Sequence, residues 1–201
     1  MKHLFLATAA LALAAQAASA DIITSGSVNV VIPTDYTGVY IDIQSFTSST
    51  VDDWDFTSSD VNFFFGGSGI ANGEAFQPVR LGTDNLDAVV NLVPGSVVDS
   101  SSVFASGFGG SENVHLGTGE GQFLPGEIGY IGFRLEDGGE YYYGYMRVLL
   151  GNSSVGGTVL DWAYESTPGL GISVVPEPSS YALLGGVVFG LGALVWRRRC
   201  R

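Results

Sequence analysis

Residues 128–150, IGYIGFRLEDGGEYYYGYMRVLL, decide the fold of this chain. Apolar residues recur at every second position on both sides of a central acidic and glycine-rich step. Because successive side chains of a strand point to opposite faces, this alternation is typical of two strands that each present an apolar face. The residues that share these faces are Ile131, Phe133 and Leu135 in the first run, and Tyr142, Met146, Val148 and Leu150 in the second.

The two runs are joined by Glu136-Asp137-Gly138-Gly139, and an Asp-Gly step between alternating runs is a strong hairpin signal. If both apolar sets face one core, the numbers of paired residues must add to an odd value. We therefore predict a four-residue loop, Glu136 to Gly139, with Leu135 paired to Glu140.

Further short runs of alternating or β-branched residues are separated by glycine, proline, asparagine and aspartate. This pattern predicts an all-β fold, an antiparallel β-sandwich of jelly-roll type, for the body of the chain. In the last of these runs Leu160, Trp162 and Tyr164 should share one side. The expected strands are Val28–Ile32, Val39–Gln44, Val61–Phe65, Val89–Val93, Val97–Phe104 and Thr158–Tyr164.

The first 20 residues have the features of a secretory signal peptide. Lys2 precedes an apolar run, and Ala18 and Ala20 give the small-x-small pattern of a signal-peptidase site, which places cleavage before Asp21. We expect a signal helix over residues 1–20 that is handled by the Sec translocon and signal peptidase.

The other end of the chain predicts a single membrane-spanning helix over Tyr181–Trp196, which contains no charged residue. Such a helix would reach roughly 24 Å at about 1.5 Å per residue, slightly less than the ~30 Å hydrocarbon layer. Arg197, Arg198, Arg199 and Arg201 follow it and should remain cytoplasmic, which stops export at this point. The body, residues 21–174, should then lie on the side of the inner membrane opposite the cytoplasm.

The exported part of the chain is strongly acidic. Of the 8 basic residues, Lys2 and four tail arginines lie outside residues 21–180, so 3 basic residues face 20 acidic ones and the net charge is about −17. This charge excludes nucleic acid as a partner. The single cysteine, Cys200, lies in the tail, so the body must fold without disulfides.

The segment Val175-Pro176-Glu177-Pro178-Ser179-Ser180, the apolar run and the arginine cluster follow one another in fixed order. Residues 175–201 as a whole resemble the PEP-CTERM sorting signal of Gram-negative bacteria. The resemblance implies recognition of Pro176, Glu177 and Pro178 by an exosortase, a membrane protease, and release towards the cell surface or extracellular space, often alongside exopolysaccharide production. The two prolines would keep the segment extended just outside the bilayer.

The chemistry of the body is less defined. Asp52, Asp53, Asp55 and Asp60 supply hard oxygen ligands, and residues 83–87 supply a second set, so a structural calcium ion is the one cofactor that we consider. The acids around Trp54 could also belong to a sugar site or a glycan-hydrolysing pair. Tyrosines 141, 142, 143 and 145 could stack on sugars, although strand alternation divides them between two faces. His115, the sole histidine of the body, is expected to be an ordinary loop residue.

These observations lead to one main expectation and two alternatives. The main expectation is an exported, non-enzymatic structural protein of the cell surface or extracellular matrix, linked to exopolysaccharide or biofilm. The first alternative is a calcium- or carbohydrate-binding module in the same matrix. An extracellular hydrolase is the least favoured, because no assembled catalytic set is visible in the sequence.

Overall fold

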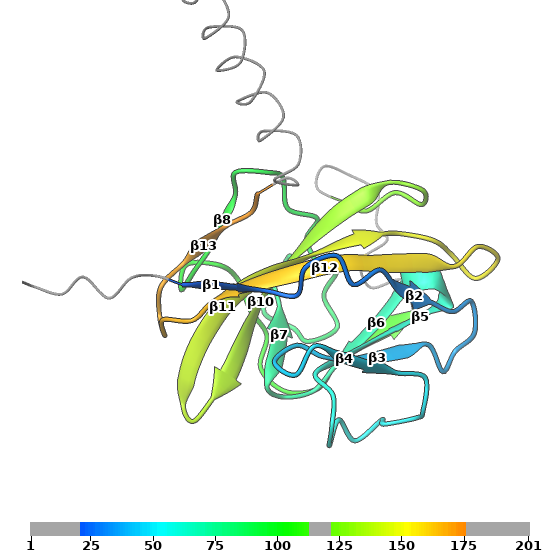
Figure 1. Ribbon diagram of the computed structural model, residues 1–201, viewed down its shortest axis with the longest axis horizontal. Coiled ribbons are helices and arrows are strands. Elements are labelled where there is room, and N and C mark those ends of the chain that lie inside the picture. The colour runs from blue at the N-terminus through cyan, green and yellow to red at the C-terminus, as the bar shows by residue number, and fades with distance from the viewer. Residues whose placement is uncertain (1–20, 113–121, 176–201) are drawn as a thin grey trace, which may run out of the picture.

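The computed structural model describes residues 21–112 and 122–175, and its fold is all-β with antiparallel sheets, as the sequence predicts (Figure 1). These two ranges contain no α-helix. The elements are β1 (Ile22–Thr24), β2 (Val30–Ile32), β3 (Val39–Asp42), β4 (Thr47–Ser49), β5 (Val61–Phe64), the short 3₁₀ turn η1 (Phe65–Gly67), β6 (Gly69–Asn72), β7 (Phe76–Pro78), β8 (Val97–Val98), β9 (Gly109–Glu112), β10 (Ile128–Asp137), β11 (Glu140–Leu149), β12 (Gly157–Glu165) and β13 (Ile172–Ser173).

The β10–β11 hairpin has a tighter turn than the sequence predicts. The register ends at Asp137↔Glu140, so the turn is Gly138-Gly139, with φ of 63° and 87°. A type I′ turn needs positive φ at both central residues, which two glycines adopt without strain. The predicted pairing of Leu135 with Glu140 is therefore wrong, since Leu135 pairs with Tyr142. The shift is an even number of residues, and both apolar sets still face one core.

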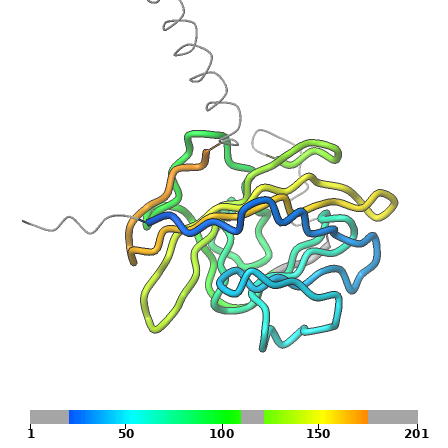
Figure 2. Tube along the Cα trace, in the orientation of Figure 1, coloured from blue at the N-terminus to red at the C-terminus, as the bar shows by residue number. Residues whose placement is uncertain are grey.

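The described residues of the body form three sheets (Figures 1 and 2). The largest has the order β1-β12-β11-β10-β7, with β2 also paired to β12. The second has the order β4-β3-β5-β6-β9, and the third contains only β13 and β8. The predicted strands at 28–32, 39–44 and 61–65 correspond to β2, β3 and β5. Residues 89–93 form only isolated bridges, and of the predicted strand 97–104 only β8 is formed.

The main core lies between the two large sheets. Ile41 and Phe63 from the five-stranded sheet and Phe133 and Met146 from the six-stranded sheet are among its fully buried members. Trp162 of β12 joins the sheets directly, because its indole N–H donates a hydrogen bond to the Ile43 carbonyl at 3.0 Å. A buried indole needs such an acceptor, so this bond fixes one sheet relative to the other.

A second core covers the opposite face of the six-stranded sheet. Tyr143 and Tyr145 of β11 point to this side and pack with Val98, Ile172 and Val174. The third sheet, β8–β13, lies over this face at the opposite side of the molecule from β3 and β4 (Figure 1). Both faces of the β10–β11 hairpin are therefore buried.

A β-bulge in β12 changes which residues reach the main core. The β11–β12 register shifts between Arg147, which pairs with Asp161, and Val148, which pairs with Val159. Leu160 is the extra residue, and its carbonyl accepts hydrogen bonds from the N–H groups of Val28 and Asn29 at 3.1 and 3.2 Å. The prediction that Leu160 shares a side with Trp162 is therefore wrong. Val159 takes the core position instead, since a bulge interrupts strand alternation.

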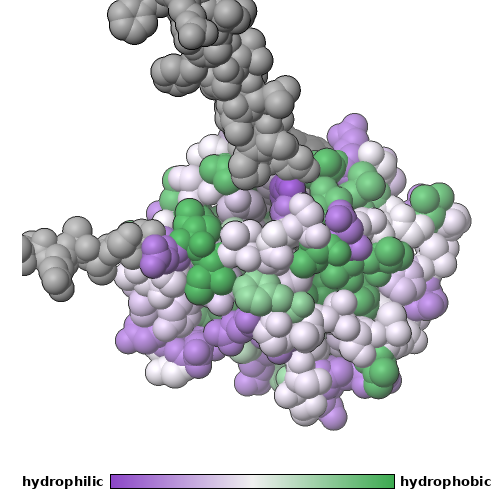
Figure 3. All heavy atoms as spheres, viewed as in Figure 1, coloured by the Kyte–Doolittle hydropathy of each residue, from purple (hydrophilic) through white to green (hydrophobic). Residues whose placement is uncertain are grey.

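The signal peptide at residues 1–20, the predicted membrane helix at Tyr181–Trp196 and His115 lie outside the described residues. Within the described ranges, no helix has the length and apolar character needed to cross a bilayer. On the face seen in Figure 3, hydrophobic residues gather over β1, β2 and β12. Ile22 in β1 and Val31 in β2 are both more than half exposed.

Truncation should show where the folded body ends. A protein of residues 21–180 keeps every strand and both cores, so we expect unchanged β-type circular dichroism. A protein of residues 21–171 loses Ile172 and Val174, and burial of each aliphatic side chain contributes about 1.5–3 kcal/mol. Urea unfolding should therefore show a loss of roughly 3–6 kcal/mol for the shorter chain. Loss of β structure in the 21–180 protein would contradict the separation of body and tail.

Candidate functional site

The C-terminal end of the body fixes the point from which the sorting segment leaves. The Val174 N–H donates to the Ser96 carbonyl, and the Gly95 N–H donates to the Val174 carbonyl, both at 2.8 Å. The Val174 side chain is completely buried in the second core, and the backbone of Val175 hydrogen-bonds with the Tyr145 hydroxyl. The predicted recognition residues Pro176, Glu177 and Pro178, and Arg197 to Arg199, lie outside the described residues. In the sequence, Pro176 follows directly after Val175.

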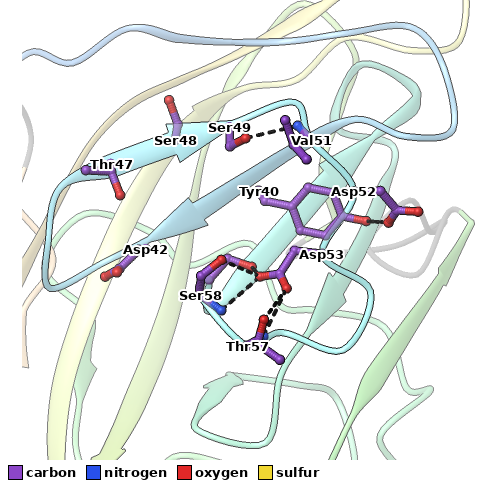
Figure 4. Close-up of a pocket in the computed structure, with 11 residues that line it drawn as sticks. Tyr40, Asp42, Thr47, Ser48, Ser49, Val51, Asp52, Asp53, Thr57 and Ser58 are labelled. Atoms are coloured by element: carbon purple, nitrogen blue, oxygen red, sulfur yellow. Dashed lines mark hydrogen bonds between the residues drawn. The ribbon is translucent and has the colours of Figure 1, made fainter.

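A polar pocket of about 470 Å³ lies beside β3 and β4, and the acidic loop of residues 50–60 forms one wall (Figure 4). Its lining includes Tyr40, Asp42, Asp52 and Asp53, with hydroxyl groups from neighbouring serines and threonines. Of the four predicted calcium ligands, Asp52 and Asp53 line this pocket.

Asp53 is occupied by its own loop. Its carboxylate accepts hydrogen bonds from the backbone N–H groups and hydroxyls of Thr57 and Ser58 and from the hydroxyl of Ser59, at 2.7–3.1 Å. Burial opposes its ionisation, but these donors outweigh that effect and hold the pKa of Asp53 well below its usual range. The carboxylate therefore closes the 53–59 loop and has little capacity left for an external ligand.

Asp52 and Asp60 are also engaged in bonds within the protein. Asp52 accepts a hydrogen bond from the Tyr40 hydroxyl at 2.9 Å, and burial together with this bond raises the pKa of Tyr40. Asp60 accepts the Ile43 N–H at 2.7 Å. Burial raises the pKa of Asp60 to about 6, with a smaller contribution from the charge of Asp42, while the bond from Ile43 acts in the opposite direction.

The structure does not bring the four predicted calcium ligands together. Asp55 is exposed, and the other three carboxylates accept from different donors: Asp52 from Tyr40, Asp53 from residues 57–59 and Asp60 from Ile43. Within residues 21–112 and 122–175, no group of three or more acidic, histidine or cysteine side chains could share a metal ion.

The second acidic set, residues 83–87, surrounds a cation of the protein itself. Arg80 is buried, and its guanidinium donates to the Asp87 carbonyl at 2.6 Å and to Asn72 Oδ1 at 2.9 Å. Burial lowers the pKa of Arg80, while the charges of Asp87 and Asp84 act in the opposite direction. Sequence analysis did not identify this arginine, because nothing in its neighbours marks it as buried.

Trp54 belongs to an aromatic cluster on the outer side of the five-stranded sheet. It stacks on Tyr36 with ring centroids 5.3 Å apart and also contacts the rings of Tyr40 and Phe64. Trp54 and Tyr36 are both exposed. A groove of about 300 Å³ continues from Trp54 and Phe56 towards residues 86 and 108. Only the fold brings these rings together, since residues 36, 54 and 64 belong to separate segments.

The tyrosines of β11 do not form an exposed platform. Tyr143 and Tyr145 are buried in the second core, and Tyr141 and Tyr142 are half-buried against the second and the main core. Tyr141 also packs against the Arg134 guanidinium, which lies between its ring and that of Phe104, at 4.3 and 4.5 Å from the two centroids. The stacked pair of Trp54 and Tyr36 is an exposed aromatic surface instead.

The family model of the PEP-CTERM protein-sorting motif matches residues 174–199. No match was found among curated proteins or among solved structures. The chain therefore carries a PEP-CTERM sorting motif, which indicates an exported protein that an exosortase, a membrane protein, processes at its C-terminal end. The match begins at Val174, so its first residue is also a buried residue of the body.

The raised pKa of Asp60 predicts a pH dependence of stability. Its value of about 6 lies above the ordinary 3.8, so the folded state favours the protonated form, and stability falls as the pH rises from about 4 to above 6. Asp60→Asn keeps an acceptor for Ile43 without the charge. We expect this variant to be more stable than the wild type at pH 7 by at most about 3 kcal/mol, and equal to it near pH 4.

Urea unfolding between pH 4 and pH 8 measures this difference. Asp55→Asn, at an exposed position of the same loop, is the matched control and should follow the wild type at every pH. If the difference in unfolding free energy between Asp60→Asn and the wild type does not change with pH, the pKa of Asp60 is not raised in the folded protein.

Proposed function

We propose that this chain is a structural, non-enzymatic protein of the cell surface or extracellular matrix, linked to exopolysaccharide, that an exosortase sorts from the inner membrane. The PEP-CTERM motif at residues 174–199 carries this proposal. Before processing, the single helix over 181–196 would hold the protein in the inner membrane, with Arg197 to Arg199 on the cytoplasmic side. Sec translocon and signal peptidase would act first, at Ala18 and Ala20.

The body has the properties of a passenger that remains folded after release. Every described strand and both cores end by Val174, and no disulfide is needed. A β-sandwich of jelly-roll type is the form that we infer for it. The three arginines of the body all engage inward-facing partners: Arg80 binds Asn72, Arg134 binds Gln77 and Arg147 binds Asp161. The acidic charge of the surface is therefore left uncompensated, which favours solubility in a crowded matrix.

The pocket supports a structural interpretation of its acids. Asp52 and Asp53 use their oxygens to hold the 50–60 loop, so neither is positioned as one member of a free carboxylate pair. Glycan hydrolysis uses two such carboxylates on either side of the scissile bond. A calcium ion would have to displace these bonds before it could bind.

Carbohydrate binding is the second candidate, because one observation favours it. Trp54 and Tyr36 form an exposed, stacked aromatic pair beside a groove and a hydroxyl-lined pocket. Aromatic faces with polar groups at their edges suit the apolar faces and hydroxyls of sugars. The matrix role and this binding role are compatible, since a matrix protein can hold its own polysaccharide.

Replacement of Pro176, Glu177 and Pro178 by alanine should leave an unprocessed precursor in the inner membrane. The change removes the proposed recognition residues and lies beyond the last buried residue, Val174, so the body should remain folded. Ser179→Ala with Ser180→Ala is the control at adjacent positions and should be processed as the wild type. Intact mass spectrometry of the protein from its native host, combined with membrane fractionation, reports the outcome. An unchanged mass and location would exclude recognition through Pro-Glu-Pro.

Glycan-array binding, with and without calcium, distinguishes the two candidate functions. The carbohydrate candidate predicts binding by the wild type that falls about five- to tenfold in Trp54→Ala, because loss of one aromatic stacking partner costs roughly 1–1.5 kcal/mol. Val31→Ala, at an exposed position of β2 outside the hydroxyl-lined pocket, should bind as the wild type. Absence of any binding by the wild type would leave the structural role alone.

A further inference from the structure

The end of the body from which the sorting segment leaves is built from two segments without charge. Residues 88–98, AVVNLVPGSVV, and residues 166–175, STPGLGISVV, contain no acidic or basic side chain. They pair through Ile172↔Val98 and Ser173↔Val97, and Val174 continues the pairing to Gly95 and Ser96. In a body with so many acidic residues the two segments themselves are neutral, and Asp99 lies at their border, beside Gly171.

Three valines on these segments remain in solvent. Val93, Val97 and Val175 are 66%, 53% and 47% exposed, while their neighbours Val98 and Val174 are buried. Ser96 donates its N–H to the Val93 carbonyl and accepts from Val174, so the turn at 93–96 lies next to the last described residues. The exposed valines therefore surround the point where the chain continues into the sorting motif. We call residues 93–97 and 172–175 the exit face.

The tail allows this face little distance from the bilayer. Five residues, 176–180, separate Val175 from Tyr181, the first residue of the apolar run, and the six Cα–Cα steps between them span at most about 20 Å. A body of this size has a radius of gyration of about 15 Å, so its diameter is close to 40 Å. The interfacial layer occupies about 5–7 Å of the available 20 Å. The exit face must therefore lie within about 15 Å of the lipid headgroups.

Charge favours an orientation in which the exit face is the part of the body nearest to the membrane. The acidic loop of residues 50–60 lies by β3 and β4, at the opposite side of the molecule from β8 and β13 (Figure 1). Anionic headgroups repel that end but do not repel the exit face. A body held at one point will therefore turn its neutral end inward, where exposed aliphatic side chains gain by leaving water.

We propose that in the anchored precursor the exit face lies against the bilayer surface, with Val93, Val97 and Val175 in the headgroup layer. This inference rests on the proposed anchoring through residues 181–196. It gives the exit face a partner, a lipid surface, and it places the Trp54–Tyr36 pair on the side that faces away from the membrane. The aromatic surface is then free while the protein is still anchored.

Fluorescence quenching tests this orientation in the anchored precursor, residues 21–201. Cys200→Ser removes the single cysteine, and Val93→Cys, Val31→Cys or Val51→Cys then supplies one labelling site. These three valines are similarly exposed, at 66%, 68% and 74%, but lie on the exit face, on the β2 side and in the acidic loop. Each protein carries a bimane label and is reconstituted into vesicles of phosphatidylcholine and phosphatidylglycerol that contain a headgroup nitroxide lipid.

We expect the label at residue 93 to lose about half of its fluorescence, and the labels at residues 31 and 51 to lose almost none. Adding Val97→Asp to the residue 93 protein should restore most of that fluorescence, because a charge on the exit face opposes contact. Equal quenching at all three sites, or none at residue 93, in protein that floats with the vesicles would overturn the orientation and leave the anchor intact. Failure to float would overturn the anchor, and the orientation with it. Quenching unaffected by Val97→Asp would overturn contact through the valines.

Discussion

The burial of both faces of the β10–β11 hairpin is the constraint on which the rest of the fold depends. An antiparallel hairpin commonly leaves one face in water. Here Phe133 and Met146 occupy one face, and Tyr143 and Tyr145 occupy the other. Each face requires a cover: the five-stranded sheet supplies the first, and the segments around β8 and β13 supply the second. The C-terminal segment is thus part of the fold up to Val174, where the sorting motif already begins.

Most of the main core could be predicted from alternation alone, since Ile131, Phe133 and Leu135 face it as expected. The errors have local physical causes. The Gly-Gly turn is two residues shorter than the predicted loop. The sequence could not distinguish the two lengths, because the numbers of paired residues add to an odd value in both. The bulge at Leu160 could not be predicted, since its reason is the pair of N–H groups from Val28 and Asn29, far away in the sequence. The second core was missed because residues 88–104 cover the sheet largely without forming strands.

The acidic cluster shows the limit of composition as evidence for a site. Proximity of Asp52, Asp53 and Asp55 in the sequence predicts shared ligation, but hydrogen bonding is decided by the nearest donors. Thr57, Ser58 and Ser59 return to Asp53, and the Tyr40 hydroxyl reaches Asp52 across the sheet. The aromatic pair behaves in the opposite way, because Tyr36 and Trp54 have no sequence relation that predicts their stacking. Composition therefore did not indicate which partners these acids bind, nor that the two rings stack.

The overlap of body and motif at Val174 also restricts what processing can leave behind. A cut beyond Val175 keeps Ile172 and Val174 in the second core and keeps the bonds from residues 95 and 96 to the chain end. A cut before Ile172 would uncover Tyr143 and Tyr145 and expose an apolar surface on the released protein. The fold itself protects these residues, because an extended segment must leave its sheet partner before a protease can bind it. The pairing that gives this protection ends with Val174, two residues before Pro176.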